Sequence, residues 1–412
     1  MNVGLLADGP VLAPSSLTAG RLARSLSESR LPLVLASSEE RGWFGGAQIA
    51  CWDPVCVATH LTLGQASDAL ERVMRGQERV LAAAVLTYEG AAEVRTYTGG
   101  VQLAADGWRA WGTARELPVP PNAEASPEAP GPVLLDVTAD LDESGYLTRV
   151  DRIRERIAAG DVYVLNLTYR LSGRPALDPA SAFAVLLERA AGPMSAWWGD
   201  PSRSLVSASP ERFCAVDSDA HGQLRAWIEP IKGTRPRARD PRRDAELARE
   251  LAADAKERAE HVMIVDLERN DLGRVAVPGS VRVDPMLEVF STPYCHQLVS
   301  RVEAVLSADA GLADLVASTF PCGSVTGAPK RAAMRVIAEL ECSPRGAYTG
   351  ALLVALPGRL DSSVLIRTLE YDGPHAARWG TGCGITIDSD PNAEWRESRL
   401  KAVPVLAAAG AT

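Results

Sequence analysis

The chain has 412 residues, of which 46% are hydrophobic and 23% are charged. This composition is ordinary for globular proteins, so a sizeable core is expected in one large or two to three smaller domains. The net charge of −9 argues against a nucleic-acid-binding surface, which would need a basic face. Because no secretory signal opens the chain and no apolar run could span a membrane, we expect a cytoplasmic protein with reduced thiols.

Residues 1–117 alternate short β-rich runs with turns and predict the N-terminal β-rich part of a fold. Residues 118–132 are rich in proline and lack periodicity, which is typical of an extended linker. Residues 133–412 mix strand-like and helical patterns. We expect them to form the larger part of the fold, and the motifs below lie in this region.

Helical patterns recur in that region. A helix over 146–159 is expected to stop at Gly160, and a strand follows over 162–171. Apolar residues at steps of four predict one long helix over 244–262. The segment 315–340 breaks at the turn PCGSVTGAPK and then resumes as a helix.

Two pairs of glutamates are spaced three residues apart: Glu257 and Glu260 in KERAEH, and Glu394 and Glu397 in AEWRES. Residues three apart on a helix share a face. Four clustered carboxylates repel one another unless a cation lies among them, and oxygen ligands suit Mg²⁺ or Ca²⁺ better than zinc. Because Mg²⁺ keeps water ligands, two carboxylates would bind directly and two through water. Such pairs are also common on solvated helices, and spacing alone does not bring the two pairs together.

Glycine-rich turns at 230–237, 321–330 and 380–390 permit close approach of the backbone to a ligand, and their N–H groups can bind an anion. Glu211 ends an apolar run, where a carboxyl group can act as a general acid. Lys232 lies between an apolar run and a glycine turn, where a desolvated amine can act as a nucleophile. Taken singly, each feature also fits a plain loop or a solvated side chain.

In this order, the motifs resemble those of the chorismate-utilising enzymes. They are SPERF, PIKGTRPR, ELAADAKERAEHVMIVDLERNDLGRVAVPGSV, STFPCGSVTGAPKRAAMRVIAELE, RGAYTGAL, IRTLE and GTGCGITIDSDPNAEWRESRLKA, and the match covers about residues 147–402. The resemblance implies an α+β, two-lobed fold. Two large, mostly antiparallel sheets would pack face to face, with helices outside and the site in a central cleft.

The resemblance also implies roles for single residues. Glu260 and Glu397 match direct magnesium ligands, and Glu257 and Glu394 match second acids that act through water. Glu211 matches the acid that protonates the departing C4 hydroxyl of chorismate. Further matches contact the substrate carboxylates or line the same pocket: Gly233, Thr234, Thr326, Tyr348, Arg367, Gly382, Gly384 and Lys401.

Two positions distinguish the members of this family. Val164 stands where the water-using synthases carry a lysine, so activation of water is not expected. Lys232 stands where anthranilate synthases have alanine, and it matches the lysine of aminodeoxychorismate synthases. The resemblance therefore implies that Lys232 adds at C2 as the C4 hydroxyl leaves, and that ammonia then adds at C4 and expels the lysine. The product would be 4-amino-4-deoxychorismate.

Alternatives stay open at this point. Anthranilate synthase component I is the alternative enzyme, and a decayed module that senses chorismate or tryptophan is the non-enzymatic one. The product could feed folate synthesis or a specialised metabolite.

The resemblance also bears on partners. Since the chain has no glutaminase nucleophile motif, a separate glutamine amidotransferase subunit is expected to supply ammonia. Related chains line a tryptophan pocket with residues that match Pro193, Met194 and Ser195, and Ser37 is a candidate to face it. Whether tryptophan binds is left open.

Two positions depart from the family pattern. Many members have a histidine where Gln297 precedes Leu-Val-Ser, and His296 lies one residue early. In a strand, that shift would point His296 to the opposite face. Cys383 replaces a smaller glycine or alanine, and little effect is expected.

Overall fold

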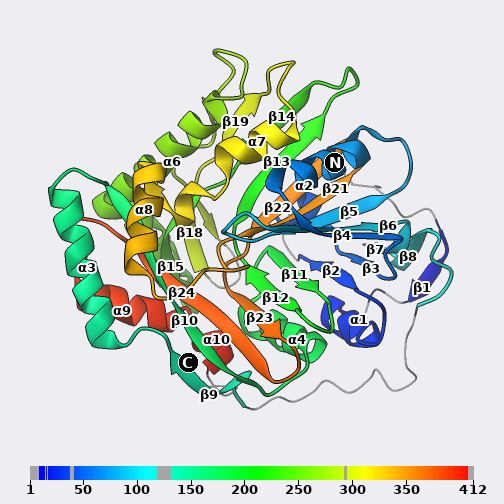
Figure 1. Cartoon of the computed structure of the whole chain (residues 1–412), viewed down its shortest axis with the longest axis horizontal. Coiled ribbons are helices and arrows are strands. Elements are labelled where there is room, and N and C mark those ends of the chain that lie inside the picture. Colours follow the sequence, from blue (N-terminus) through cyan, green and yellow to red (C-terminus); the bar gives the residue numbers. More distant parts are fainter. Residues whose placement is uncertain are drawn as a thin grey trace.

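The computed structural model describes residues 9–13, 15, 17–37, 41–117, 131–291 and 295–406. They form an α+β fold in which sheets lie at the centre and helices lie outside (Figure 1). Within this part of the chain, neighbouring strands pair antiparallel, as in the pairs that carry the cavity described below.

The largest sheet has twelve strands: β1 (Val11–Ala13), β2 (Leu33–Ala36), β3 (Ile49–Cys51), β7 (Gly99–Ala104), β8 (Gly107–Gly112), β9 (Leu134–Ala139), β10 (Val164–Pro175), β11 (Met194–Trp198), β12 (Leu205–Ser209), β20 (Gly327–Ala328), β23 (Thr368–Asp372) and β24 (Ala376–Ile385). Their order is β1-β8-β7-β3-β2-β11-β12-β23-β24-β10-β20, and β9 also pairs with β10.

The second sheet has nine strands: β4 (Cys56–Leu61), β5 (Leu81–Leu86), β6 (Ala92–Tyr97), β13 (Arg212–Ser218), β14 (Leu224–Ile228), β16 (Arg282–Val283), β19 (Val302–Val305), β21 (Ala351–Leu356) and β22 (Arg359–Val364). Their order is β16-β19-β14-β13-β22-β21-β5-β6-β4. A third sheet has the order β15-β18-β17, with bounds β15 (Ile231–Pro236), β17 (Glu288–Ser291) and β18 (Cys295–Val299).

The two large sheets pack face to face because strands in both are apolar on two faces. In β2, Leu33 and Leu35 join the buried cluster between the sheets, while Val34 and Ala36 join the cluster under the outer helices. Strand β5 of the other sheet divides its side chains in the same way. This alternation follows from the two-residue period of a strand.

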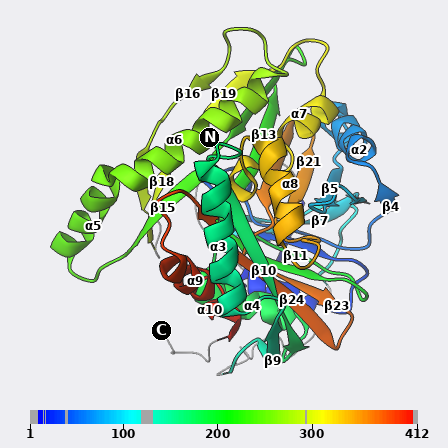
Figure 2. The same cartoon turned by 60° about the vertical axis from the view of Figure 1, so that its left-hand side comes forward.

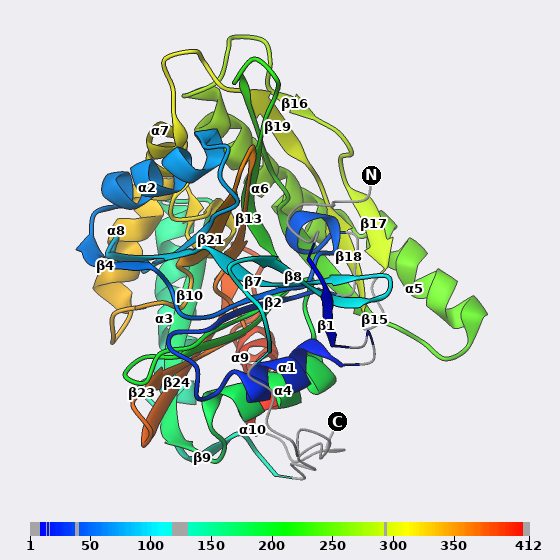
Figure 3. The same cartoon turned by 90° about the vertical axis from the view of Figure 1, so that its right-hand side faces the viewer.

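Helices cover the outer faces of both sheets (Figures 2 and 3). Those packed on the twelve-stranded sheet are α1 (Ala19–Ser25), α3 (Glu143–Ala158), α4 (Pro179–Ala190), α8 (Lys330–Leu340), α9 (Pro391–Leu400) and α10 (Val403–Leu406). Those on the nine-stranded sheet are α2 (Leu63–Arg75), α6 (Ala255–Gly273) and α7 (Leu312–Thr319). Helix α5 (Pro241–Ala253) packs on the small sheet and projects from the rest of the molecule. No helix in the described ranges is long and apolar enough to cross a membrane.

The prediction of one long helix over 244–262 is wrong, because α5 and α6 are separate helices. Asp254 lies between them with extended backbone angles, and its side chain accepts hydrogen bonds from the backbone N–H groups of Lys256 and Glu257. An aspartate in this position caps the following helix. It thereby starts α6 at Ala255, two residues before Glu257.

Other predicted elements are confirmed. Helix α3 ends at Ala158, and Gly160 follows with a φ of +83°, the left-handed conformation of a helix stop. Strand β10 then begins at Val164. The strands of residues 1–117 belong to both large sheets, so this part shares one fold with the remainder. Most of the predicted linker, residues 118–130, lies outside the described residues.

Candidate active site

A cavity of about 690 Å³ lies between β15, β24, α6 and α9. This volume is typical of small-molecule sites. Nearly all of the predicted site residues line it: Glu211, Lys232, Gly233, Thr234, Glu257, Glu260, Tyr348, Arg367, Gly382, Gly384, Glu394, Glu397 and Lys401. The fold therefore brings together residues that are far apart in the sequence.

The two glutamate pairs meet in this cavity. Glu257 and Glu260 lie in the first turns of α6, and Glu394 and Glu397 lie on α9. The Ser389 hydroxyl donates a hydrogen bond of 2.7 Å to Glu394 Oε1. Both segments are helical, so the spacing of three gives each pair a common face, as the sequence predicted.

Burial and neighbouring carboxylates act on two of the four glutamates, whereas Lys401, acting against burial, lowers the pKa of Glu397. Burial raises the pKa of Glu260, and Glu257 and Glu394 raise it further against the opposing effect of nearby lysines. Burial also raises the pKa of Glu394, and Glu397 adds to this rise. A divalent cation would relieve this repulsion, and oxygen-only donors suit Mg²⁺ or Ca²⁺.

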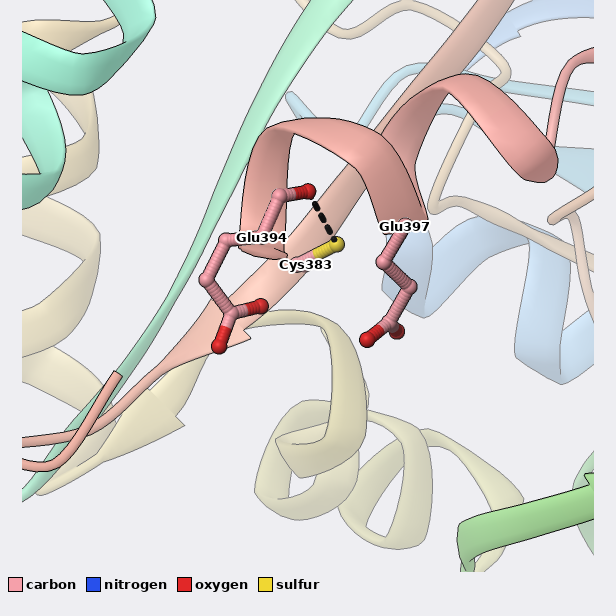
Figure 4. Close-up of side chains that lie close together, drawn as sticks. All are labelled: Cys383, Glu394 and Glu397. Carbon is pink, nitrogen blue, oxygen red and sulfur yellow. Dashed lines mark hydrogen bonds between the residues drawn. The ribbon is translucent and has the colours of Figure 1, made fainter. Parts of the chain in front are cut away.

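Cys383 lies beside Glu394 and Glu397, with one potential ligand atom from each within 4.8 Å of the others (Figure 4). Its thiol donates a hydrogen bond of 3.4 Å to the backbone carbonyl of Glu394. Burial raises the pKa of Cys383 to about 12, so the group stays a thiol, whereas metals bind the thiolate. The protonated thiol is therefore less suited to bind a metal than the carboxylates.

Glu211 is a buried acid at the cavity wall. It follows β12, and its Oε1 has no hydrogen-bond partner among the described residues. Burial raises the pKa of Glu211 to about 7, although Ser324 and Lys232 oppose the rise. The carboxyl group is therefore substantially protonated at neutral pH and can donate a proton.

Lys232 lies within strand β15, beside a bulge at Gly233, rather than in a turn. Gly233 has a φ of +79°, which permits the bulge. The Lys232 side chain extends toward β24, because a Cβ atom added at Gly384 would lie 2.9 Å from its Nζ. Its positive charge lowers the pKa of both Glu211 and Glu260 against the effect of burial. The amine thus lies between the acid and the carboxylate cluster.

A positively charged wall completes the cavity. Arg367 has no acidic partner among the described residues, and burial lowers its pKa. Lys401 donates a hydrogen bond of 2.9 Å to Gly382 O and lies 2.9 Å from Glu397. The Tyr348 ring stacks under the Arg170 guanidinium, 4.7 Å from its centroid. These groups can receive the carboxylates of a dianionic ligand.

Thr326 departs from the prediction. It is fully buried, it does not line the cavity, and its hydroxyl donates to Cys322 O at 3.0 Å. The hydroxyl thus holds the turn before α8 together. The hydroxyl that does reach the cavity from this turn is that of Ser324.

Among the described residues, three members of the predicted tryptophan pocket, Ser37, Met194 and Ser195, are buried. Met194 and Ser195 are buried in β11, and the Trp43 indole donates a hydrogen bond of 2.9 Å to Ser195 O. Ser37 packs so closely on Gly42 that no Cβ atom would fit between them. The cavity that Pro193 lines has about 20 Å³, room for roughly one water molecule.

The departure at His296 has a structural explanation. His296 is buried and hydrogen-bonds Ser291 Oγ at 2.7 Å and Asp244 Oδ1 at 3.0 Å. The adjacent Gln297 lines the small cavity beside Pro193. The side chains of His296 and Gln297 therefore face different parts of the protein, as the alternation of side chains along a strand predicts.

Sequence reasoning missed several basic and polar residues of the cavity. Arg235 contacts Glu257 at 3.3 Å and Asp254 at 2.7 Å, and Lys256 lies 3.8 Å from Glu260. Both residues could have been recognised from the sequence, because Arg235 lies in the motif PIKGTRPR and Lys256 begins KERAEH. Both basic side chains partly neutralise the carboxylate cluster.

Comparison with known proteins gives a match to the family described as chorismate binding enzyme over residues 58–407. The aminodeoxychorismate synthase of Streptomyces griseus is 42% identical over 284 residues, which is 69% of this chain and 39% of that protein. Anthranilate synthase component 1 of Synechocystis is 37% identical over 302 residues, 71% of this chain and 59% of that protein. The chain thus spans about two fifths of the first relative and about three fifths of the second.

Solved structures share the fold. Anthranilate synthase component I from Streptococcus pneumoniae superposes with a TM-score of 0.73 at 24% identity, covering 87% of this chain and 91% of that one. The menaquinone-specific isochorismate synthase from Escherichia coli has a TM-score of 0.75 at 17% identity, covering 94% and 90%. The predicted α+β, two-lobed fold is therefore confirmed.

Proposed function

The chain belongs to the family of chorismate binding enzymes, and on this premise we propose that it is an aminodeoxychorismate synthase, converting chorismate and ammonia into 4-amino-4-deoxychorismate. Relatives of similar identity carry both this name and that of anthranilate synthase component 1. The choice between them rests on one observation, the amine of Lys232 inside the cavity beside the buried acid Glu211.

Two residues carry the proposed chemistry. Glu211, in its acid form, protonates the C4 hydroxyl of chorismate, which leaves as water while the neutral form of the Lys232 amine forms a bond to C2. Ammonia then bonds to C4, the C2–nitrogen bond breaks and Lys232 recovers its lone pair, and the new C4 ammonium group returns a proton to Glu211. The covalent route replaces one difficult displacement by two allylic ones.

The remaining residues hold the substrate. Glu260 and Glu397 would bind Mg²⁺ directly, and Glu257 and Glu394 through water. When bound, the ion fixes the ring carboxylate and offsets its charge. Arg367 suits the enolpyruvyl carboxylate because its planar fork can donate two hydrogen bonds to one carboxylate.

The other cavity residues complete this proposal. Tyr348 would help to hold the enolpyruvyl carboxylate, and Gly233, Thr234, Gly382, Gly384 and Lys401 would shape or contact the carboxylate sites. We further propose that a separate glutamine amidotransferase subunit supplies the ammonia in the cytoplasm. Ammonium salts replace this partner in a test.

The test incubates the full chain with chorismate, Mg²⁺ and ammonium, and identifies the amino product by chromatography and mass spectrometry, with and without an added lyase. We expect 4-amino-4-deoxychorismate from the wild type. Lys232→Ala and the charge-preserving Lys232→Arg should both lose this product, because neither offers an amine that can add and leave. Anthranilate from the wild type, or undiminished 4-amino product from Lys232→Ala, would contradict the proposal.

A further inference from the structure

A second buried acid, Glu268 on α6, lies behind the cavity and has no part in the chemistry above. Its side chain is fully buried, and its Oε1 accepts hydrogen bonds from the Gly323 N–H at 3.0 Å and the Cys322 thiol at 3.5 Å. Its Oε2 has no hydrogen-bond partner among the described residues. Burying a carboxyl group in this way costs free energy, so its presence calls for an explanation.

A line of polar groups joins Glu268 to the cavity. The Cys322 sulfur lies 3.2 Å from the Ser324 hydroxyl. Ser324 lines the cavity, and its hydroxyl lowers the pKa of Glu211 against the larger opposing effect of burial. Hydrogen bonds thus connect Glu268 through the Cys322 thiol to Ser324, and Ser324 lines the same cavity as Glu211.

The protonation of Glu268 depends on the charged and titratable groups that face it. These are Asp271 on its own helix, Lys330 at the start of α8, Cys322 after α7 and Cys214 on β13. Helices α6, α7 and α8 can be followed together in Figures 1 and 2. Lys330 is held by the Asp271 carboxylate at 2.5 Å and by Thr319 O at 2.7 Å.

Both ends of the line can exchange a proton near neutral pH. Burial raises the pKa of Glu268 to about 7, against the opposing effect of Lys330, and that of Glu211 to about 7 as well. Glu211 faces Lys232, Ser324 and Cys322. Burial raises the pKa of the Cys322 thiol well above its usual value, so the thiol stays protonated and can donate.

We propose that Glu268 is a positioning residue for Glu211, which it holds in the acid form through the Cys322 thiol and the Ser324 hydroxyl. The ionised Glu268 carboxylate accepts the hydrogen bond of the Cys322 thiol, so the Ser324 hydroxyl donates to Cys322 and its oxygen is left to accept from the acid form of Glu211. The negative charge lies on Glu268, beside Lys330 and the Gly323 N–H.

The role in catalysis rests on the proposed function, but the link between the two acids is a property of the free protein. Infrared spectroscopy of the full chain without substrate can follow both groups through the C=O stretch of protonated carboxyl groups. Bands lost in Glu211→Gln and Glu268→Gln identify them. In Glu268→Gln we expect the midpoint of the Glu211 titration to fall by about half a pH unit or more, because a neighbouring negative charge no longer favours the proton.

A matched pair of variants tests the path itself. Cys322→Ala removes the link and should lower the Glu211 midpoint as Glu268→Gln does, whereas Cys322→Ser keeps a donor and acceptor and should preserve it. Asp266→Asn changes a charge on the exposed side of α6, where the side chain is 77% exposed, and should leave the midpoint unchanged. An unchanged midpoint in Glu268→Gln, or equal shifts in both Cys322 variants, would overturn the proposal.

Turnover gives a second readout. If the chain makes the 4-amino product, Glu268→Gln should move the fall in kcat at high pH downward by the same shift, a loss of about threefold at pH 8 with KM unchanged. A structural role alone would lower kcat equally at all pH values. Failure to make this product would reject the proposed function and leave the infrared result to decide the link between the acids.

Discussion

Gly384 controls where the Lys232 amine can lie, and Gly384→Ala tests this directly. A Cβ atom at Gly384 would have two neighbours within 4 Å, Lys232 Nζ at 2.9 Å and Val164 Cγ2 at 3.9 Å. The contact with Val164 is an ordinary one. The methyl group therefore collides only with the end of a flexible side chain.

The expected size of the effect follows from these distances. Non-bonded heavy atoms prefer about 3.5–4.0 Å, so the amine must retreat by roughly half an ångström or more. Misplacement of a reacting group by about 1 Å can cost roughly 100-fold in rate. We expect a loss of about 10- to 100-fold in kcat, which is about 1.4–2.7 kcal/mol of transition-state stabilisation. Stability should rise by up to about 1 kcal/mol, because alanine loses less backbone entropy than glycine in a strand.

Steady-state rates of product formation and urea unfolding measure the two effects separately. Gly64→Ala is the matched control, since a Cβ atom at Gly64 on α2 meets nothing within 4 Å. It should leave activity unchanged. Gly382→Ala is the contrasting case, because its Cβ atom would collide with the rigid backbone carbonyl of Leu167, and it should unfold more readily.

Two results would refute this reasoning. Wild-type kcat in Gly384→Ala would mean that the amine does not act from the position beside β24. A rise in KM with unchanged kcat would mean that the methyl group excludes substrate and leaves the amine in place.

Further predictions concern acidity, metal, packing and a small ligand. Burial raises the pKa of Glu211 from 4.5 to about 7, so ionised Glu211 destabilises the folded state by an amount that is zero below pH 4.5 and grows until the pH reaches about 7. Glu211→Gln should therefore raise the free energy of unfolding at pH 8 by roughly 3 kcal/mol, measured by urea unfolding, while the variant loses activity. Mg²⁺ should raise the melting temperature of the wild type and have a smaller effect on Glu260→Gln, measured by scanning calorimetry. Arg212 forms buried ion pairs with Glu229 and Asp361, so Arg212→Met should cost about 3–5 kcal/mol in urea unfolding, because buried Asp361 loses its ion-pair partner while Glu229 keeps Arg41 and Arg301. Free tryptophan should leave the melting temperature unchanged, because the cavity at the predicted pocket holds about one water molecule.

Much of the local structure could be predicted from neighbouring residues. The three-residue spacing of each glutamate pair fixed a common helix face, and Gly160 marked the end of α3. These features depend on backbone geometry over a few residues. The same local reasoning failed at Asp254, where a favourable apolar period continued across a residue that caps a new helix.

The resemblance of the motifs gave the residues of the site, but not every side-chain direction. Thr326 belongs to a matching motif, yet its hydroxyl bonds to its own turn while Ser324 reaches the cavity. Likewise, Ser195 matches a pocket residue, although Trp43 already contacts its carbonyl. Such directions depend on neighbours that are remote in the sequence and that a motif does not contain.

The sequence by itself determined which helices and strands form and which chemical groups they carry, because alternation, capping and helical spacing act between residues a few positions apart. Only the tertiary structure decided that the glutamates of α6 and α9 share one cavity and that the Lys232 amine reaches Gly384 across it. It also decided that Glu211 and Glu268 are buried acids. These outcomes depend on the packing of two sheets whose strands come from the whole chain, and burial is set by that packing rather than by the sequence neighbours.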